Sequence, residues 1–329
     1  MMKIICYGVV QGDIDCFHEA EKSRGVELIL VAEPLSEKNI QDAKGCDAVS
    51  VTVSSVVTAE RMKIFADMGI KFVTARSVGY NYIDLEAAKA HGIRVSNTLY
   101  SEHCVADFTL MLMLMTVRKA GYMLQKAQSY DYTVHGMRGR DMPNLTVGVI
   151  GTGRIGNAVI DRVHGFGSKI LAFDLYPKES LKGIVDYVPL EELIQKSDII
   201  TFHAPATKEN EHLFNAKSLE MAKDGVILIN TSRGELINTE VMLEGLATGK
   251  IAAAGLDTFE DELGLIRTNV GEGIRHYKNL MLLQALPNVI LTPHVAYYTD
   301  QTREDLVYNN IDNLLNMAKN ESIPCEVKA

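Results

Sequence analysis

Short apolar runs of strand length alternate with amphipathic segments of helical periodicity along the first hundred residues. Runs rich in β-branched residues are typical of strands, and apolar residues three and four positions apart are typical of helices. The expected strands are residues 2–8, Val26–Val31, Ala48–Val53, Lys71–Ala75 and Arg94–Ser96, with helices at Ala59–Met68 and Asp84–His91. This alternation predicts parallel βαβ units in a small α/β domain.

A second series of strands begins at Thr146. Six are expected, at Thr146–Ile150, Lys169–Phe173, Ile199–His203, Gly225–Asn230, Ile251–Asp257 and Val289–Pro293, and the helical stretches between most of them include Leu190–Lys196, Ser218–Lys223 and Thr239–Thr248. The pattern predicts a doubly wound parallel sheet, which binds ligands outside the carboxyl ends of its strands.

Two longer helices are expected to connect these regions. One runs from Ser101, as N-cap, to Lys119, and the other runs from about Thr302 to Lys319 and returns to the first domain. We therefore assign residues 1–100 and 299–329 to a smaller substrate domain and residues 101–298 to a dinucleotide-binding domain.

Composition narrows the class of protein. The chain has 329 residues, enough for two domains, and its 47% hydrophobic and 23% charged residues are ordinary for a globular protein. A net charge of −9 without a basic cluster argues against a nucleic-acid partner.

The cysteines and apolar runs indicate a cytoplasmic protein that uses neither metal nor membrane. Five scattered cysteines fit reduced thiols rather than a disulfide framework or a zinc site. The N-terminal apolar run is too short for a signal peptide. Phe108–Val117 is too short to cross a bilayer, so we expect a buried helix there, with Leu110–Met115 as a candidate subunit interface.

The strand from Thr146 ends in Gly151-Thr152-Gly153-Arg154-Ile155-Gly156, and a helical pattern follows at once. Strand, glycine-rich turn and helix together are the context of a dinucleotide-binding motif. Gly151 permits a tight turn, Gly153 lets the backbone approach a pyrophosphate, and Gly156 allows close packing of helix on strand. Asp174 closes the next strand, where its carboxylate can accept hydrogen bonds from ribose hydroxyls and repel a 2′-phosphate. The expected cofactor is therefore NAD rather than NADP.

Polar residues follow all six strands of this series. Because the carboxyl ends of parallel strands share one edge of the sheet, these residues are expected to converge. They are the glycine-rich turn, Asp174, His203-Ala204-Pro205, Thr231-Ser232-Arg233-Gly234, Asp257 with nearby acids, and Pro293-His294.

A hydride-transfer site for a carbonyl also needs a proton donor and an anchor. His294 is the preferred acid and base, because an acidic loop at Glu260, Asp261 and Glu262 can hold its imidazole; His203 is the competitor. Arg233 is the preferred anchor, since its planar fork can bind a carboxylate. The turn from Arg76 to Asn81 either offers amides to an anion or is an ordinary strand-to-helix turn.

Four motifs in this order resemble the D-2-hydroxyacid dehydrogenases: GTGRIG, TSRG at 231–234, DTFEDE at 257–262 and TPH at 292–294. The resemblance covers nearly the whole chain and implies a Rossmann-type NAD-binding domain and a smaller flavodoxin-like domain. It further implies that Arg233 binds the 2-oxo acid, that His294 protonates the carbonyl oxygen, and that Glu262 pairs with His294.

The resemblance also implies the remaining site residues. Asp257 is expected to contact the nicotinamide carboxamide. The full set expected around NAD is Gly151, Gly153, Arg154, Ile155, Gly156, Asp174, His203, Pro205, Thr231, Ser232 and Asp257, and the set expected around the substrate is Val78, Gly79, Tyr100 and Tyr298.

The segment Leu263–Pro287 and the sequence HVAYYT resemble the D-lactate dehydrogenase branch, which includes the enzymes of glycopeptide resistance. We therefore expect a homodimer that reduces pyruvate to the D (R) hydroxy acid. A larger 2-oxo acid, such as 2-oxoisocaproate or phenylpyruvate, is the first alternative. The second is a nucleotide-sensing binding protein like the transcriptional corepressors, which look to carry a long flexible tail that is not seen here.

Overall fold

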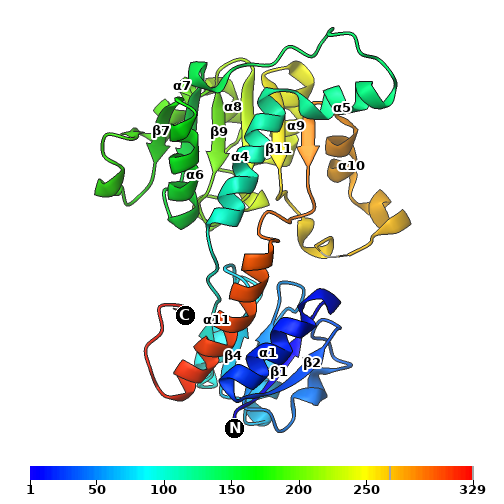
Figure 1. Ribbon diagram of the computed structural model, residues 1–329, viewed down its shortest axis with the longest axis vertical. Helices are drawn as coiled ribbons and strands as arrows, with labels where there is room; N and C mark the ends of the chain where they lie inside the picture. The colour runs from blue at the N-terminus through cyan, green and yellow to red at the C-terminus, as the bar shows by residue number, and fades with distance from the viewer. Residues whose placement is uncertain (267, 328–329) are drawn as a thin grey trace. The chain divides into compact units, whose positions relative to one another are not determined.

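The computed structural model describes residues 1–266 and 268–327, and the chain divides into two compact units (Figure 1). One unit comprises Met1–Ser101 with Tyr298–Ala329, and the other comprises Glu102–Tyr297. Arg267 lies outside the described residues; it belongs to the segment Leu263–Pro287, which resembles the D-lactate dehydrogenase branch. Residues 328–329 of the expected first domain also lie outside the described residues. The assignment of substrate and nucleotide to the two units stays a prediction.

The first unit contains a six-stranded sheet in the order β13-β5-β4-β3-β1-β2. β13 is antiparallel to β5, and the other described pairs are parallel. The order of β1 to β5 is that of the flavodoxin-like fold, as predicted. The strands are β1 Lys3–Tyr7, β2 Glu27–Val31, β3 Ala48–Val51, β4 Phe72–Ala75, β5 Arg94–Ser96 and β13 Glu326–Val327.

Apolar clusters cover both faces of this sheet. α2 and α3 contribute to one cluster, with Phe65 and Ala88, while α1 and α11 contribute to the other, with Phe17 and Leu314. Sequence periodicity identified α2, α3 and α11 but missed α1. The helices are α1 Ile14–Arg24, α2 Ala59–Asp67, α3 Leu85–Ala90 and α11 Asp300–Ala318.

The second unit contains a seven-stranded parallel sheet in the order β12-β11-β10-β9-β6-β7-β8. From β6 the strands β7 and β8 are added on one side of the sheet, and from β9 the strands β10, β11 and β12 are added on the other side. The boundary between β6 and β9 is therefore the switch point where a doubly wound fold binds its ligand. The expected six strands are confirmed, and the seventh, β8, is too short to show periodicity. The strands are β6 Thr146–Ile150, β7 Lys169–Phe173, β8 Asp186–Tyr187, β9 Ile199–Phe202, β10 Val226–Asn230, β11 Ile251–Leu256 and β12 Val289–Leu291.

Helices cover both faces of the second sheet (Figure 1). α4 and α6 pack side by side on one face, where Leu112, Met113 and Val159 are fully buried. α7, α9 and α10 contribute Leu193, Met242 and Leu283 to the other face's core. The helices are α4 His103–Val117, α5 Ala120–Gln128, α6 Arg154–Gly165, α7 Leu190–Lys196, α8 Ala216–Met221, α9 Thr239–Thr248 and α10 Lys278–Ala285.

Short 3₁₀ turns complete the described elements. They are η1 Gln11–Asp13, η2 Ile40–Ala43, η3 Met142–Asn144, η4 Glu179–Leu181, η5 Gly234–Leu236, η6 Glu262–Gly264 and η7 Gly271–His276.

The expected helix from Ser101 to Lys119 is wrong at both ends. The N-cap of α4 is Glu102, and the Ser101 backbone N–H donates to Asp305 Oδ2 at 2.9 Å. Lys119 adopts a left-handed conformation (φ 55°), which ends α4 and starts α5 in a new direction. Within residues 1–266 and 268–327, no helix is long and apolar enough to span a membrane.

Candidate active site

The glycine-rich turn between β6 and α6 has steric requirements that only glycine meets. Gly151 has φ +91°, and a Cβ there would lie 2.7 Å from the His203 carbonyl carbon. A Cβ on Gly156 would lie 2.0 Å from the Gly151 carbonyl oxygen, so α6 packs directly on the turn. At Gly153, by contrast, a Cβ would meet nothing within 4 Å. The backbone of Gly153 is therefore open on the side where a phosphate would approach.

The start of α6 fits an anionic ligand. Gly153 is the N-cap and provides no side-chain cap, so the N–H groups of the first turn lie at the positive end of the helix dipole. Arg154, the first residue of α6, forms an ion pair with Glu102 at 2.5 Å, and Ile155 is half-buried against the core. The turn and helix thus have the features needed to hold the pyrophosphate of NAD.

Asp174 lies at the end of β7, beside this turn. Its Oδ2 accepts hydrogen bonds from the Thr152 N–H (2.5 Å) and hydroxyl (3.0 Å), and its Oδ1 accepts one from the Tyr176 N–H (2.8 Å). Burial raises the pKa of Asp174, but these hydrogen bonds outweigh it and hold the pKa below its usual value. Asp174 is therefore a fixed negative charge, with Oδ1 able to accept further hydrogen bonds from a ribose.

Replacing Asp174 with alanine is expected to weaken discrimination against NADP, because the charge that repels a 2′-phosphate is removed. The ratio of kcat/KM for NADH to that for NADPH should fall by roughly 10-fold or more, equivalent to one or two charge-assisted hydrogen bonds. Steady-state kinetics with both cofactors measures the ratio. An unchanged ratio would contradict a role of Asp174 in the selection of NADH over NADPH.

His203 and Pro205 follow β9 at the switch point. His203 Nε2 contacts Thr201 Oγ1 at 2.9 Å, while Nδ1 is buried without a partner among the described residues. Burial lowers the pKa of His203 to about 3, so its imidazole is neutral at ordinary pH. This favours His294 over His203 as the proton donor. Pro205 is exposed, and its carbonyl accepts from Asn210 Nδ2.

Thr231, Ser232 and Arg233 form the loop after β10. Thr231 is buried, with its hydroxyl 2.8 Å from that of Thr109. The Ser232 hydroxyl donates to the Ala204 carbonyl at 2.6 Å, which connects this loop to the one after β9. Arg233 is half-buried, and only its Nη1 has a hydrogen bond among the described residues, to the Ser232 carbonyl. Most of the guanidinium fork is thus available for an anion.

His294 and Glu262 form a carboxylate–imidazole pair. His294 Nδ1 lies 2.9 Å from Glu262 Oε1, and the Glu262 side chain is 10% exposed. Because a carboxylate accepts, Nδ1 carries a proton, and Nε2 is the nitrogen that can give or take one. His294 has φ 55°, an unusual conformation for a residue with a side chain, and the Tyr297 ring packs edge-on against its imidazole.

Asp257 supports the loop that carries His294. Its carboxylate is 1% exposed and accepts from the Thr292 hydroxyl (2.5 Å) and the backbone N–H groups of Val295 (2.9 Å) and Ala296 (2.8 Å). These bonds hold the residues on both sides of His294. The contact with nicotinamide stays a prediction, and this supporting role was missed because it depends on the fold of the later loop.

The loops of Arg233 and Glu262 are packed together. A Cβ on Gly234 would lie 2.0 Å from the Phe259 carbonyl carbon, so the backbones after β10 and β11 are in direct contact. From the sequence, Glu260, Asp261 and Glu262 were expected to form one acidic loop that could hold the His294 imidazole. Of these three acids, Glu262 contacts His294 in the structure, whereas Glu260 is hydrogen-bonded to His212, a histidine that was not among the expected site residues.

The expected substrate-binding residues belong to the other unit. Val78 and Gly79 follow β4, where their carbonyls accept from Asn97 Nδ2 (2.7 Å) and the Ser77 hydroxyl (2.5 Å). Tyr100 is half-buried, while Tyr298 is 60% exposed. Their role toward a substrate stays a prediction.

Comparison with known proteins gives the family. Residues 110–296 match the model of the D-isomer specific 2-hydroxyacid dehydrogenase NAD binding domain. The chain is 38% identical to an aromatic 2-oxoacid reductase of Clostridium sporogenes, over 95% of each chain. It is 33% identical to a D-lactate dehydrogenase of Escherichia coli, over 99% of this chain and 100% of the relative.

A solved structure of D-2-hydroxyisocaproate dehydrogenase matches with a TM-score of 0.90 and 35% identity, covering 100% of both chains. The matches extend over both units, and the motifs GTGRIG, TSRG, DTFEDE and TPH all lie in the unit Glu102–Tyr297. The chain belongs to the D-isomer specific 2-hydroxyacid dehydrogenase family and is an NAD-dependent oxidoreductase of 2-oxo and 2-hydroxy acids.

Proposed function

We propose that the enzyme reduces pyruvate to D-lactate, with Arg233, Glu262 and His294 as the residues that act on the substrate. The observation that carries the proposal is the Glu262–His294 pair at 2.9 Å, because it leaves one ring nitrogen of a fixed imidazole as the proton donor. NADH, when bound, supplies the hydride for the carbonyl carbon. The Gly151–Gly156 turn and Asp174 would hold it.

The protein residues bind the substrate and transfer the proton. The Arg233 fork binds the substrate carboxylate and fixes its carbonyl. Protonated His294 donates from Nε2 to the carbonyl oxygen as the alcohol forms, and its ring becomes neutral. Glu262 stabilises the imidazolium before this transfer and keeps the ring oriented. In oxidation of the hydroxy acid, neutral His294 takes the hydroxyl proton back.

A larger 2-oxo acid is the second candidate substrate, because relatives of this chain are named for aromatic 2-oxo acids as well as for D-lactate. Each additional methylene in a binding pocket changes selectivity by only about 1–3 kcal/mol, so a few side chains decide between them. We expect the highest kcat/KM with pyruvate when NADH oxidation is compared for pyruvate, 2-oxoisocaproate, phenylpyruvate and 2-oxoglutarate. Preference for phenylpyruvate or 2-oxoisocaproate would overturn the pyruvate assignment and keep the site.

We further propose that the enzyme is a homodimer, through a contact that includes side chains beyond the Leu110–Met115 segment expected from the sequence. Leu112 and Met113 of the expected Leu110–Met115 interface are fully buried in the core of their own unit. Met111 in the same segment is 39% exposed, and more strongly exposed apolar side chains lie further on, at Tyr130 (86%), Tyr132 (76%) and Val134 (83%). Apolar groups concentrated in this way are typical of protein–protein contacts.

The loop that carries these side chains is folded around Lys126. Its Nζ donates to the carbonyls of Thr133 (3.0 Å) and His135 (3.3 Å) and forms an ion pair with Asp131 at 2.9 Å. Hydrogen bonds from Thr133 and this ion pair lower the pKa of Asp131 to about 2. The loop therefore presents two exposed tyrosines on either side of a carboxylate whose charge is balanced by Lys126.

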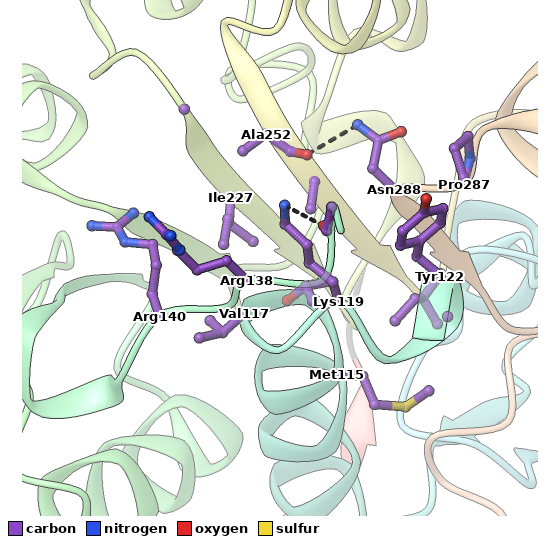
Figure 2. Close-up of a pocket in the computed structure, with 16 residues that line it drawn as sticks. Met115, Val117, Lys119, Tyr122, Arg138, Arg140, Ile227, Ala252, Pro287 and Asn288 are labelled. Atoms are coloured by element: carbon purple, nitrogen blue, oxygen red, sulfur yellow. Dashed lines mark hydrogen bonds between the residues drawn. The ribbon is translucent and has the colours of Figure 1, made fainter. Parts of the chain in front are cut away.

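A cavity of about 420 Å³ lies next to this loop, near the amino ends of β10, β11 and β12 (Figure 2). Apolar residues, including Ile227, Ala253 and Ile290, form much of its lining, while Lys119, Arg138 and Arg140 add positive charge. Its apolar lining suits the Tyr130 and Tyr132 rings of a second copy. A two-fold dimer would make this contact twice.

Replacing Tyr130 and Tyr132 together with serine is expected to convert the dimer to a monomer, because each dimer loses four buried aromatic rings. Sedimentation equilibrium over a range of concentrations measures the change. Tyr176→Ser, at a tyrosine that is 83% exposed elsewhere on the same unit, is the control and should remain dimeric. A monomeric wild-type protein, or a double variant that stays dimeric, would contradict the proposal.

A further inference from the structure

The loop after β11 carries the carboxylates of two carboxylate–imidazole pairs, of which the proposed chemistry uses one. Glu262 contacts His294, and Glu260 Oε1 lies 2.5 Å from His212 Nε2. Asp261, between the two acids, adopts a left-handed conformation (φ 62°). The Glu260–His212 pair is largely shielded from solvent, with side chains 23% and 35% exposed.

Glu260 connects three loops at the carboxyl ends of neighbouring strands. Its Oε1 contacts His212 on the loop after β9, and its Oε2 accepts from the Thr239 N–H, after β10, at 2.6 Å. Glu260 itself lies after β11. The His212 N–H donates to the Glu235 carbonyl at 2.7 Å, which joins the first two loops a second time.

The Asn238 amide determines which ring nitrogen of His212 carries the hydrogen. Asn238 Oδ1 caps α9 by accepting from the Val241 N–H at 3.0 Å, so the Asn238 amide nitrogen faces His212 Nδ1 at 3.2 Å. An amide nitrogen only donates, so Nδ1 accepts and Nε2–H donates to Glu260. Glu260 thus accepts one hydrogen bond on each oxygen, and neither donor can be turned into an acceptor.

Two of these loops carry residues that act on the substrate in the proposed function. Glu262 lies two residues after Glu260, and Arg233 precedes Gly234, whose backbone contacts Phe259 directly. Movement of the Glu260 segment would therefore displace both the carboxylate that holds His294 and the loop of the anchoring arginine.

We infer that Glu260 and His212 are positioning residues for this reaction: they fix the Glu262 and Arg233 loops against each other without contacting the substrate. This inference rests on the proposed roles of Arg233, Glu262 and His294. Sub-ångström placement of reacting groups matters, since a displacement of about 1 Å can cost roughly 100-fold in rate.

Glu260→Ala and His212→Leu are expected to lower kcat/KM for the 2-oxo acid by roughly 10–100-fold, as is typical when residues that orient catalytic groups are removed. The dissociation constant of NADH should change by a much smaller factor, because the turn at Gly151–Gly156 and Asp174 lie outside these loops. The pH profile of kcat/KM should shift, because Glu262 is no longer held against His294. His212→Gln should restore activity, since its amide N–H can replace Nε2–H as donor to Glu260.

Asp198→Ala is the control for a general loss of stability. Its carboxylate also holds a backbone N–H, that of Thr146 (2.9 Å), and an ion pair, with Lys223 (3.1 Å), but at the amino end of β9. The Asp198→Ala substitution should lower Tm without shifting the pH profile of kcat/KM. Glu260→Ala with wild-type kcat/KM and pH profile, or with losses no greater than those of Asp198→Ala, would overturn the inference.

His294→Ala in the same assay separates this inference from the proposed function. A His294→Ala enzyme with wild-type turnover contradicts the site assignment itself. Loss of turnover in His294→Ala together with a fully active Glu260→Ala contradicts only the positioning role.

Discussion

Replacing His294 with alanine is expected to lower kcat by about 10²–10⁴-fold, the usual contribution of general acid–base catalysis. Without the imidazole, the proton donor that Glu262 holds in place is lost, and water must protonate the developing alkoxide. NADH affinity should not change, because the turn at Gly151–Gly156 and Asp174 lie on other strands of the sheet. Stopped-flow kinetics and fluorescence titration of NADH measure the two effects separately.

Glu262→Gln is the matched variant for this pair. The amide keeps the size of the side chain and an acceptor for His294 Nδ1, but it cannot stabilise a positive ring. We expect kcat to fall by a smaller factor than in His294→Ala and the pH profile to move to lower pH, because the imidazolium is less favoured without the negative charge. A His294→Ala enzyme with wild-type kcat would require a different proton donor.

Replacing Arg233 with lysine is expected to lower kcat/KM for the 2-oxo acid by roughly 10–100-fold, equivalent to one charge-assisted hydrogen bond. The planar fork can donate two parallel hydrogen bonds to a carboxylate, while an ammonium group acts as a point charge. KM should rise as well as kcat fall, because the same fork binds the substrate and orients its carbonyl.

Arg162→Lys is the control for that experiment. Arg162 is an arginine of α6 that forms an ion pair with Asp107 at 2.5 Å, outside the loops after β9, β10 and β11. Its replacement should leave kcat/KM unchanged. Equal kcat/KM in Arg233→Lys and wild type would exclude a bidentate anchor at position 233.

The parts of the fold that were predicted are those encoded by local sequence. The strands of both sheets read directly as apolar runs, and the turn at Gly151–Gly156 is set by contacts within one strand–turn–helix unit. Two of the missed elements are strands that exist only through pairing, and one missed feature is a break set by the conformation of a single residue. β13 forms only by pairing with β5, β8 only by pairing with β7, and the break between α4 and α5 depends on the conformation of Lys119.

The site, too, contains residues that the sequence predicted and residues whose roles it did not show. Arg233, Glu262 and His294 were selected because their residue types suit the chemistry and their motifs resemble a known family. The roles of Asp257 in holding the His294 loop and of Glu260 in holding His212 could not be read from the sequence. Both arise from hydrogen bonds between loops whose contacts exist only in the folded unit.

The most direct test of the central claim is the stereochemistry of the product. Purified enzyme, NADH and pyruvate should give one D-lactate for each NADH oxidised, and His294→Ala should give the same product at a rate about 10²–10⁴-fold lower under the same conditions. L-lactate, a racemic product, or NADH oxidation without lactate would contradict the account.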